Sequence, residues 1–475
     1  MNKEEICYMS AFEMGEKIKT QELSSIEITE LIIERIEKIN PIINAYCTTT
    51  FDLARDMAKE ADKAVKRGDK LGLLHGIPTS IKDLMLTKGI RTTYGSKLYE
   101  NFVPEVDEVA VKRLKKAGII LLGKTNTPEF GHVTITDNLV FGETKNPWNI
   151  ERTSGGSSGG AAAATAAGIS PLSLGSDGGG SIRVPSCLCG VFGFKSTYGK
   201  IPKYPRRGTN FYTIDHYGPI TRFVKDAALM FNVLKGPHSA DRQSLPEDNI
   251  DYTEAIKSKL PKLKIGYSLS LGVTKVIEDE VEQAVLESIR KLEQFGWVTE
   301  KANVELKKVN NAFYSFACIG AAYDYGKKLE EWRDRITPGF VKQITIGLTT
   351  PGIAYQMAWD QRLGIDEEMY KFFKNYDILI TPTTAVPAFE LGKVHVDKIK
   401  GKAVSHAGWY AFTPAFNLTG LPAASIPCGW SSEGLPIGMQ IIGKRFDDAL
   451  VFQVSKAFEE VAPWQDKRPK INYKH

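Results

Sequence analysis

Serines set among glycines mark one stretch of the chain, residues 153–197, as the place where chemistry is most plausible. GGSSGG contains Ser157 and Ser158, and GSDGGGSIR contains Ser181. A serine hydroxyl becomes a good nucleophile when a neighbouring base takes its proton. Glycine lets the backbone turn sharply, so that several N–H groups can point together at a developing oxyanion. The stretch therefore has the residue types that acyl transfer through a serine requires.

Three other interpretations of this stretch fit less well. A phosphate-binding loop needs G-x-x-x-x-G-K-[ST], or G-x-G-x-x-G after a strand, and neither occurs here in that context. Residues 155–159 match G-x-S-x-G, but a nucleophile elbow needs a buried strand directly before it, and KNPWNIERTS is not expected to form a strand. A flexible linker would not alternate with an alanine-rich helix, AAAATAAG, and an apolar run, PLSLG.

A lysine in LHGIPTSIKDLM, Lys82, is a possible base. A lysine between apolar neighbours most often lies at the surface with its stem on apolar groups, and the residues alone favour that interpretation. Burial beside Ile81, Leu84 and Met85 would instead lower its pKa, and a neutral lysine can accept a proton.

Several motifs together resemble the signature of the amidase signature family. They are LHGIPTSIKDLM, KTNTPEFG, GGSSGGAAAATAAG, GSDGGGSIRVPSCLCGVFGFKSTYG and NLTGLPAASIPCG with GLPIGMQIIG. The resemblance covers most of the chain and is poorest over 300–370. It implies the amidase signature fold and a hydrolase that cleaves a small carboxylic amide to acid plus amine or ammonia through an acyl-serine, with neither cofactor nor metal.

The resemblance assigns roles residue by residue. Ser181 matches the nucleophile, Ser157 the bridging serine, which in the family has a cis peptide bond, and Lys82 the general base. Ser157 can relay the proton, because a hydroxyl both donates and accepts. Further positions are expected to bind the oxyanion and substrate or to support the site: Gly178, Gly179, Gly180 and Gly131 for binding, and Asp177, Arg183 and Ser158 for support. Asp177 and Arg183 could hold the loop as a bidentate pair.

Two departures from the family pattern bear on the substrate. Gly178 stands where relatives often carry threonine or a branched residue. The glutaminase subunit of the tRNA-dependent amidotransferase has an acidic substrate-binding residue near the carboxyl-terminal NL-x-GLP motif, whereas Tyr410 and Phe412 occupy that region here. We therefore expect a free-standing amidase for apolar or aromatic amides, with oligoamides possible. The glutaminase subunit is the alternative, and a binding protein on a retired scaffold is disfavoured because all three catalytic positions are filled.

The composition excludes some other classes. The chain has 475 residues, 61 Lys and Arg against 56 Asp and Glu, and a net charge of +5, interleaved without a basic patch, so no nucleic-acid partner is expected. MNKEEICYMS has no apolar signal-peptide region, and no window is apolar enough to span a membrane. Six scattered cysteines read as free thiols in a reducing cytoplasm. The family resemblance makes a homodimer plausible.

The order of expected elements indicates the fold class. Helices alternate with short apolar runs through the first 230 residues, which predicts an α/β fold with a large mixed sheet and helices on both faces. A helix is expected over 24–39, ended by Asn40-Pro41. No linker divides the chain, so we expect one domain over 1–475. Its catalytic core should span about 70–210, and a variable insertion that shapes the pocket about 300–370.

Overall fold

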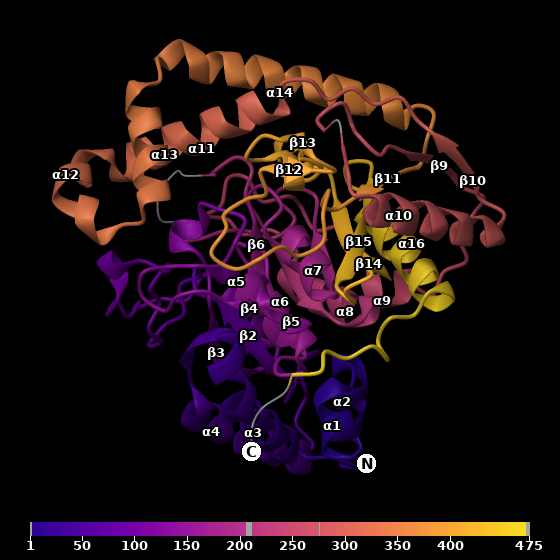
Figure 1. The fold of residues 1–475 in the computed structure, drawn as a ribbon. Coiled ribbons are helices and arrows are strands. Elements are labelled where there is room, and N and C mark those ends of the chain that lie inside the picture. Colours follow the sequence, from indigo (N-terminus) through magenta and orange to yellow (C-terminus); the bar gives the residue numbers. More distant parts are fainter. Residues whose placement is uncertain (1, 206–210, 275, 472–475) are drawn as a thin grey trace.

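A large mixed β-sheet is the centre of the computed structural model, which describes residues 2–205, 211–274 and 276–471 (Figure 1). The sheet has 11 strands. They lie side by side in the order β1 (Tyr46–Thr49), β3 (Ile120–Thr125), β2 (Pro78–Lys82), β6 (Leu172–Asp177), β8 (His216–Thr221), β7 (Phe192–Lys195), β14 (Ala423–Trp430), β15 (Pro436–Gly443), β11 (Ile378–Pro382), β9 (Lys264–Tyr267) and β10 (Val298–Lys301).

The strand pairings are mixed, as the sequence predicts. β2 runs parallel to both β3 and β6, and β9 runs parallel to β10 and β11. The pairs between these two parallel groups, including β14 with β15, are antiparallel. Because β2 and β6 are parallel neighbours, their carboxyl ends, with Lys82 and Asp177, meet at one edge of the sheet.

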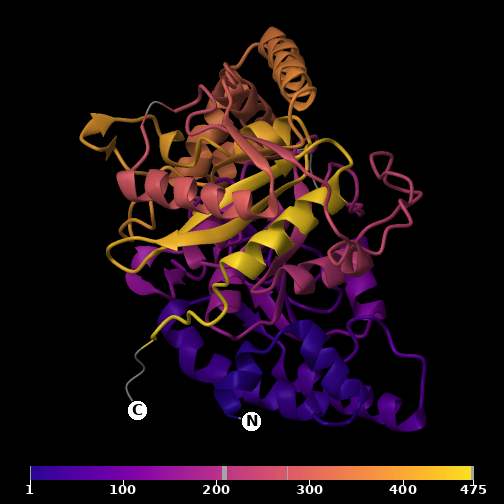
Figure 2. The same ribbon diagram turned by 90° about the vertical axis from the view of Figure 1, so that its right-hand side faces the viewer.

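Side chains alternate between the two faces of the sheet, so each face has its own core. In β11, Ile378 and Ile380 join one apolar cluster and Leu379 joins another. Helices cover the first face: α2 (Ala11–Lys19), α5 (Val109–Lys116), α8 (Val224–Leu234), α9 (Tyr252–Ala255), α10 (Asp279–Leu292) and α16 (Asp448–Val461). Figure 2 shows α10 and α16 in front of the long strands at the carboxyl end of the chain.

The opposite face carries the helices nearest the glycine-serine stretch. Around its amino-terminal strands pack α1 (Lys3–Tyr8), α3 (Ser25–Ile43), α4 (Phe51–Arg67) and α6 (Gly159–Ala166). Beside them lie α7 (Arg183–Cys189), α11 (Val309–Tyr325), α14 (Gly352–Phe373) and α15 (Pro414–Leu418). Both faces of the sheet are thus covered, which confirms the predicted fold class.

The helix expected over 24–39 is longer than predicted. It runs to Ile43 with Pro41 inside its last turn, so the expected end at Asn40-Pro41 is wrong. Pro41 has no N–H to donate, and the helix continues past it by less than one turn. Asn44 ends the helix instead, in the left-handed conformation, and its side-chain amide donates to the carbonyls of Phe141 and Glu143.

Residues 309–373 form a helical layer at one end of the molecule (Figure 1). It consists of α11, α12 (Leu329–Trp332), α13 (Pro338–Thr349) and α14. Phe313 and Phe316 of α11 are buried and join the second core, so this layer is packed onto the sheet domain. The layer falls largely within 300–370, where the sequence predicts a variable insertion.

Two short ribbons stand apart from the main sheet: β4 (Lys145–Asn146) with β5 (Asn149–Thr153), and β12 (Lys398–Ile399) with β13 (Lys402–Ala403). β5 shows that the expectation of no strand within KNPWNIERTS is wrong. Most of β5 is outside the core, in a separate sheet, so it is not the buried strand of a nucleophile elbow. Within the described part of the chain, no helix combines the length and apolarity needed to cross a bilayer.

Candidate active site

Lys82 is completely buried at the end of β2. Ile81 points into the apolar core on one face of the sheet, so Lys82 is turned toward the other. Its Nζ lies 2.6 Å from Ser157 Oγ, 2.9 Å from Ser158 Oγ and 3.0 Å from Ser176 Oγ. The structure therefore excludes the surface interpretation of this lysine and surrounds its ammonium with three hydroxyls.

The surroundings of Lys82 favour the neutral amine. Burial lowers its pKa from 10.5 to about 7, against the smaller opposing effects of the carboxylates of Asp215 and Asp177. No hydroxyl brings a negative charge to offset the loss of hydration. A large fraction of Lys82 is consequently unprotonated at neutral pH and can accept a proton.

The segment before α6 positions Ser157 and Ser158. The peptide bond between Gly156 and Ser157 is cis, the feature that the resemblance predicts. Gly131 has a positive φ of 69°, and a Cβ there would lie 3.2 Å from Ser157 Oγ and 2.9 Å from Leu84 Cδ1. A side chain at position 131 would thus crowd the Ser157 hydroxyl. Ser158 also donates its backbone N–H to Ser181 O at 3.1 Å, which ties the two serine segments together.

Ser181 follows three glycines in the loop between β6 and α7. Among the described residues, the N–H groups of Gly178, Gly179 and Ser181 donate to no acceptor. The N–H of Gly180 instead donates to Asp177 Oδ1 at 2.7 Å. This N–H is therefore not free to bind the oxyanion, the role that the sequence predicts for Gly180. The backbone N–H of Ser181 itself, which the sequence analysis omits, is available in its place.

Asp177 organises this loop. Its carboxylate accepts hydrogen bonds from the backbone N–H groups of Gly180, Ile182 and Arg183. The Arg183 side chain binds the same carboxylate through Nε at 3.0 Å and Nη2 at 2.9 Å, the bidentate pair that the sequence predicts. Burial acts to raise the pKa of Asp177, but the guanidinium of Arg183 holds it well below its usual range.

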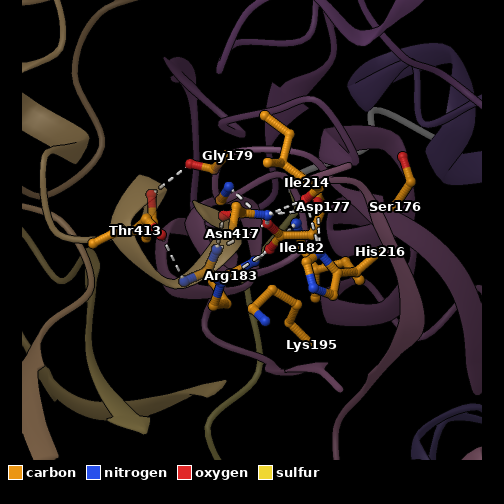
Figure 3. Close-up of polar contacts among 12 residues, drawn as sticks. Ser176, Asp177, Gly179, Ile182, Arg183, Lys195, Ile214, His216, Thr413 and Asn417 are labelled. Atoms are coloured by element: carbon orange, nitrogen blue, oxygen red, sulfur yellow. Dashed lines mark hydrogen bonds and ion pairs between the residues drawn. The ribbon is translucent and has the colours of Figure 1, made fainter. Parts of the chain in front are cut away.

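Residues far along the chain fix the pair from the other side (Figure 3). Asn417 donates to Asp177 Oδ1 at 2.8 Å, and Thr413 O accepts from Arg183 Nη1 at 3.0 Å. The Thr413 hydroxyl also donates to Gly179 O at 2.7 Å, which directs the neighbouring backbone. Every polar group of the ion pair therefore finds a partner, as a buried pair requires.

Ser157, Ser176 and Ser181 open onto one cavity of about 120 Å³. Ser181 is 5% exposed, and its hydroxyl makes no hydrogen bond to any described residue, Ser157 included. Aromatic and charged groups complete the walls: Tyr94, Tyr99, Phe130, Phe211, Tyr217 and Tyr325, with Glu108, Lys203, Asp215 and Asp324. The cavity is large enough for a small acyl group beside the nucleophile.

Two residues expected near the substrate lie elsewhere. Phe412 is fully buried, and the Tyr410 hydroxyl lies 3.1 Å from that of Tyr314. Neither is among the described residues that line the cavity, because their segment packs into the second core. The prediction that Tyr410 and Phe412 form an aromatic approach to the substrate is therefore wrong. Other aromatic rings line the cavity.

The sequence analysis missed Ser176, Thr413 and Asn417. Ser176 lies next to Asp177 in GSDGGGS, and its only signal is a second hydroxyl in that motif. Asn417 begins NLTGLP, and its contact with Asp177 spans 240 positions, so spacing cannot reveal it. Across the described ranges, no three His, Cys, Asp or Glu side chains group as metal ligands would.

Comparisons with characterised proteins place this geometry in context. The model of the amidase family matches residues 27–452. One subunit of the glutamyl-tRNA(Gln) amidotransferase of Carboxydothermus hydrogenoformans is 37% identical, with 98% of this chain and 100% of that protein covered. The acylamidase of Rhodococcus erythropolis is 36% identical, with 99% of this chain and 98% of that protein covered.

Solved structures agree with the sequence relatives. A bacterial aryl acylamidase of the amidase signature family superposes with a TM-score of 0.90 at 31% identity, covering 97% of each chain. The corresponding subunit of the glutamyl-tRNA(Gln) amidotransferase from Thermotoga maritima gives a TM-score of 0.79 at 31% identity, covering 100% of this chain and 98% of that one. The chain belongs to the amidase family and is an amidohydrolase of the amidase signature type.

Proposed function

We propose that the protein is a free-standing amidase that hydrolyses the C–N bond of a small carboxylic amide through an acyl-serine. The observation that carries this proposal is the contact of Lys82 Nζ with Ser157 Oγ at 2.6 Å, in a buried site that opens onto the same cavity as Ser181. A buried lysine of lowered pKa beside a hydroxyl is a base poised to work near neutral pH.

The proposed reaction begins with proton transfer. Neutral Lys82 takes the proton of Ser157, and Ser157 takes that of Ser181 as its Oγ bonds to the amide carbonyl carbon. For this step the Ser181 hydroxyl turns toward Ser157, which a change of side-chain rotamer allows. The N–H groups of Gly178, Gly179 and Ser181 stabilise the oxyanion, each donor contributing about 3 kcal/mol.

The second half of the proposed cycle returns the protons. Ser157 protonates the leaving nitrogen and recovers its own proton from Lys82, so the C–N bond breaks and amine or ammonia departs. Water, deprotonated along the same path, attacks the acyl carbon and releases the acid and Ser181. Asp177, Arg183 and Ser158 support the loop, and Gly131 leaves room for Ser157. No step uses a cofactor.

We also propose that the chain forms one domain. Residues 70–210 supply the catalytic groups of a single domain, and 300–370 supply part of the pocket wall. In support, Asp324 and Tyr325 of α11 line the cavity beside Ser181. The aromatic lining suits an apolar or aromatic amide, with an oligoamide as one form. We place the protein in the cytoplasm, and the family resemblance makes a homodimer plausible.

The second candidate function is that of the glutaminase subunit in a tRNA-dependent amidotransferase. It is supported by the 37% identity to the amidotransferase subunit of Carboxydothermus hydrogenoformans. The structural comparison favours the free-standing enzyme, since at the same 31% identity the aryl acylamidase has a TM-score of 0.90 and the amidotransferase subunit 0.79. The two functions differ in whether a partner is required.

A hydrolysis assay tests the proposal. Wild type and Ser181→Ala are incubated without any partner with acetamide, butyramide, anilides, a linear oligoamide and glutamine, and released ammonia or amine is measured. We expect turnover of apolar amides that the substitution abolishes. Turnover of glutamine alone, or only after a second subunit is added, would transfer the proposal to the glutaminase.

A further inference from the structure

A second cavity lies beside the catalytic one and shares Phe211 with it. It has a volume of about 310 Å³ and forms a groove, which we call the apolar groove. Its described walls are Phe211, Tyr212, Thr213, Phe316, Ile319, Gly320, Tyr323 and Tyr355. None of these residues carries a charge, whereas the catalytic cavity next to it is lined by Glu108, Lys203, Asp215 and Asp324.

One stripe of α11 forms the floor of the apolar groove. Phe316, Ile319, Gly320 and Tyr323 recur at the spacing that puts side chains on one side of a helix. Phe313, one turn earlier on the same stripe, reaches the oxyanion loop: a Cβ on Gly179 would lie 2.4 Å from its Cζ. The stripe thus extends from the reacting centre along the groove.

Tyr355 of α14 closes one side of the groove. Its ring packs edge-on against Phe316, with centroids 5.5 Å apart, and Trp359 packs on Phe316 at 5.3 Å. Phe316 is 6% exposed, but Tyr323 is 73% exposed. The groove is therefore walled by packed aromatic rings around Phe316 and is open to solvent at Tyr323.

Phe211 stands between the two cavities, over Gly178. A Cβ on Gly178 would lie 3.3 Å from both Cγ and Cδ1 of the Phe211 ring. The rings of Phe211 and Phe313 have centroids 6.0 Å apart and together cover the oxyanion loop. This explains the glycine at position 178, because a branched side chain there would press against the Phe211 ring.

We propose that the apolar groove binds an extended apolar arm of the amide substrate, and that Phe211 sets which arms can pass from the catalytic cavity into it. The inference rests on the proposed amidase function and names its substrate class: amides with a linear aliphatic or aryl arm longer than the catalytic cavity can hold. The arm belongs to either the acyl or the amine side, and two substrate series distinguish them.

The test measures kcat/KM along those two series. One series consists of anilides of straight-chain acids of increasing length, and the other of N-alkyl acetamides. Since one methylene in an apolar pocket is worth about tenfold or more in specificity, kcat/KM should rise steeply with length in one series. It should level off once the groove is full. A flat profile in both series would overturn the proposal.

A variant that fills the groove provides the second arm of the test. Ile319→Trp adds bulk at a partly exposed wall position and should reduce kcat/KM for the longest substrate at least about tenfold relative to the shortest. Tyr370→Ala is the matched control, since it removes an exposed tyrosine of α14 that lies about 22 Å from Tyr355 along the helix. Its length profile should equal that of wild type. A profile unchanged in Ile319→Trp would contradict the proposal.

Phe211 is tested by a double-mutant cycle with Gly178. Phe211→Ala should let bulkier arms, such as branched or bicyclic ones, be hydrolysed. Gly178→Thr should lower kcat/KM for long arms, because threonine displaces the ring, and its effect should shrink in the Phe211→Ala background. Additive effects would show that the two positions act separately and would refute the assigned role of Phe211.

Failure of the groove and failure of the amidase function give different results. Suppose that short amides are hydrolysed, that Ser181→Ala abolishes this activity and that the length profile is flat. The proposed amidase function then stands, and the proposed role of the groove is refuted. If no amide is hydrolysed, the proposed amidase function is refuted. Whether the groove binds an apolar arm is then tested by calorimetry, which measures the affinity of a decanoic anilide for wild type and for Ile319→Trp. Equal affinities would refute it, and weaker binding by the variant would support it.

Discussion

Two buried lysines on neighbouring strands, Lys82 and Lys124, differ in the groups that surround their amines. Lys82 on β2 and Lys124 on β3 are both fully buried, and the strands pair in parallel. Lys82 contacts three serine hydroxyls. Lys124 donates to Met85 O and Thr92 Oγ1 and lies 3.7 Å from the carboxylate of Asp83.

The difference lies in the charge of their partners. Burial lowers the pKa of both lysines. At Lys124 a carboxylate within ion-pair distance opposes that effect, whereas at Lys82 it is opposed only by the carboxylates of Asp215 and Asp177, neither of which forms an ion pair with it. Burial also raises the pKa of Asp83, which Lys124 counteracts. A buried lysine paired with a carboxylate holds structure, and a buried lysine among hydroxyls can exchange a proton. In the proposed mechanism, adjacent positions of the motif SIKD therefore have different roles: Lys82 transfers protons, and Asp83 pairs with Lys124 to hold the structure.

Lys82→Met gives the largest expected effect. Removal of the base should reduce amide hydrolysis about 10⁴-fold, as loss of one member of a catalytic triad does. At pH 7 the free energy of unfolding in urea should change little, because methionine fills the space and removes the cost of burying the amine, while three hydroxyls lose one hydrogen-bond partner. A variant that hydrolyses amides within tenfold of wild type would break the assignment of Lys82.

Lys124→Met should act on stability instead. It leaves the Asp83 carboxylate buried without its cation, at a cost of about 3–5 kcal/mol in the free energy of unfolding. Adding Asp83→Asn should restore most of that loss, and denaturant unfolding measures both. Equal stability of Lys124→Met and wild type would mean that the pair does not hold the frame.

The pH dependence of stability should separate wild type from Lys82→Met. The pKa of Lys82 is lowered to about 7 in the folded protein, so between pH 7 and 10 the unfolded chain binds one more proton there. Wild-type stability should therefore rise with pH relative to the variant, by about 1.4 kcal/mol per pH unit. Parallel curves for the two proteins would contradict the lowered pKa.

Asp215→Asn gives the smallest expected effect. The Asp215 carboxylate raises the pKa of Lys82 toward its usual value, so its removal favours the neutral amine further. The acid limb of the kcat/KM profile, expected near pH 7 in wild type, should move to lower pH by less than about one unit. A shift to higher pH would show that another group controls this limb.

Much of the fold and the motifs of the site could be predicted from local patterns in the sequence. The alternation of helices and apolar runs predicts the mixed sheet, and the glycine-serine motifs lead to Ser157 and Ser181. These features depend on neighbours within a few residues, which a single sequence displays.

Features that depend on contacts between residues far apart in the chain could not be predicted from the sequence. The burial of Lys82 follows from strand pairing and from α6, and its own neighbours favour the surface. Gly180 gives its N–H to Asp177, whose direction is fixed by Arg183 and by Asn417 from the far end of the chain. The helix continues past Pro41 to Asn44, whose side chain donates to the carbonyls of Phe141 and Glu143, about 100 positions away.

A direct titration of Lys82 tests the central claim, that its amine loses its proton near pH 7. Protein labelled with ε-¹³C-lysine is titrated by NMR, and the signal of Lys82 is identified by its absence in Lys82→Met. We predict a midpoint at about 7. A midpoint near the ordinary lysine value of about 10.4 would contradict the account, because the proposed base would then remain protonated where the enzyme is expected to work.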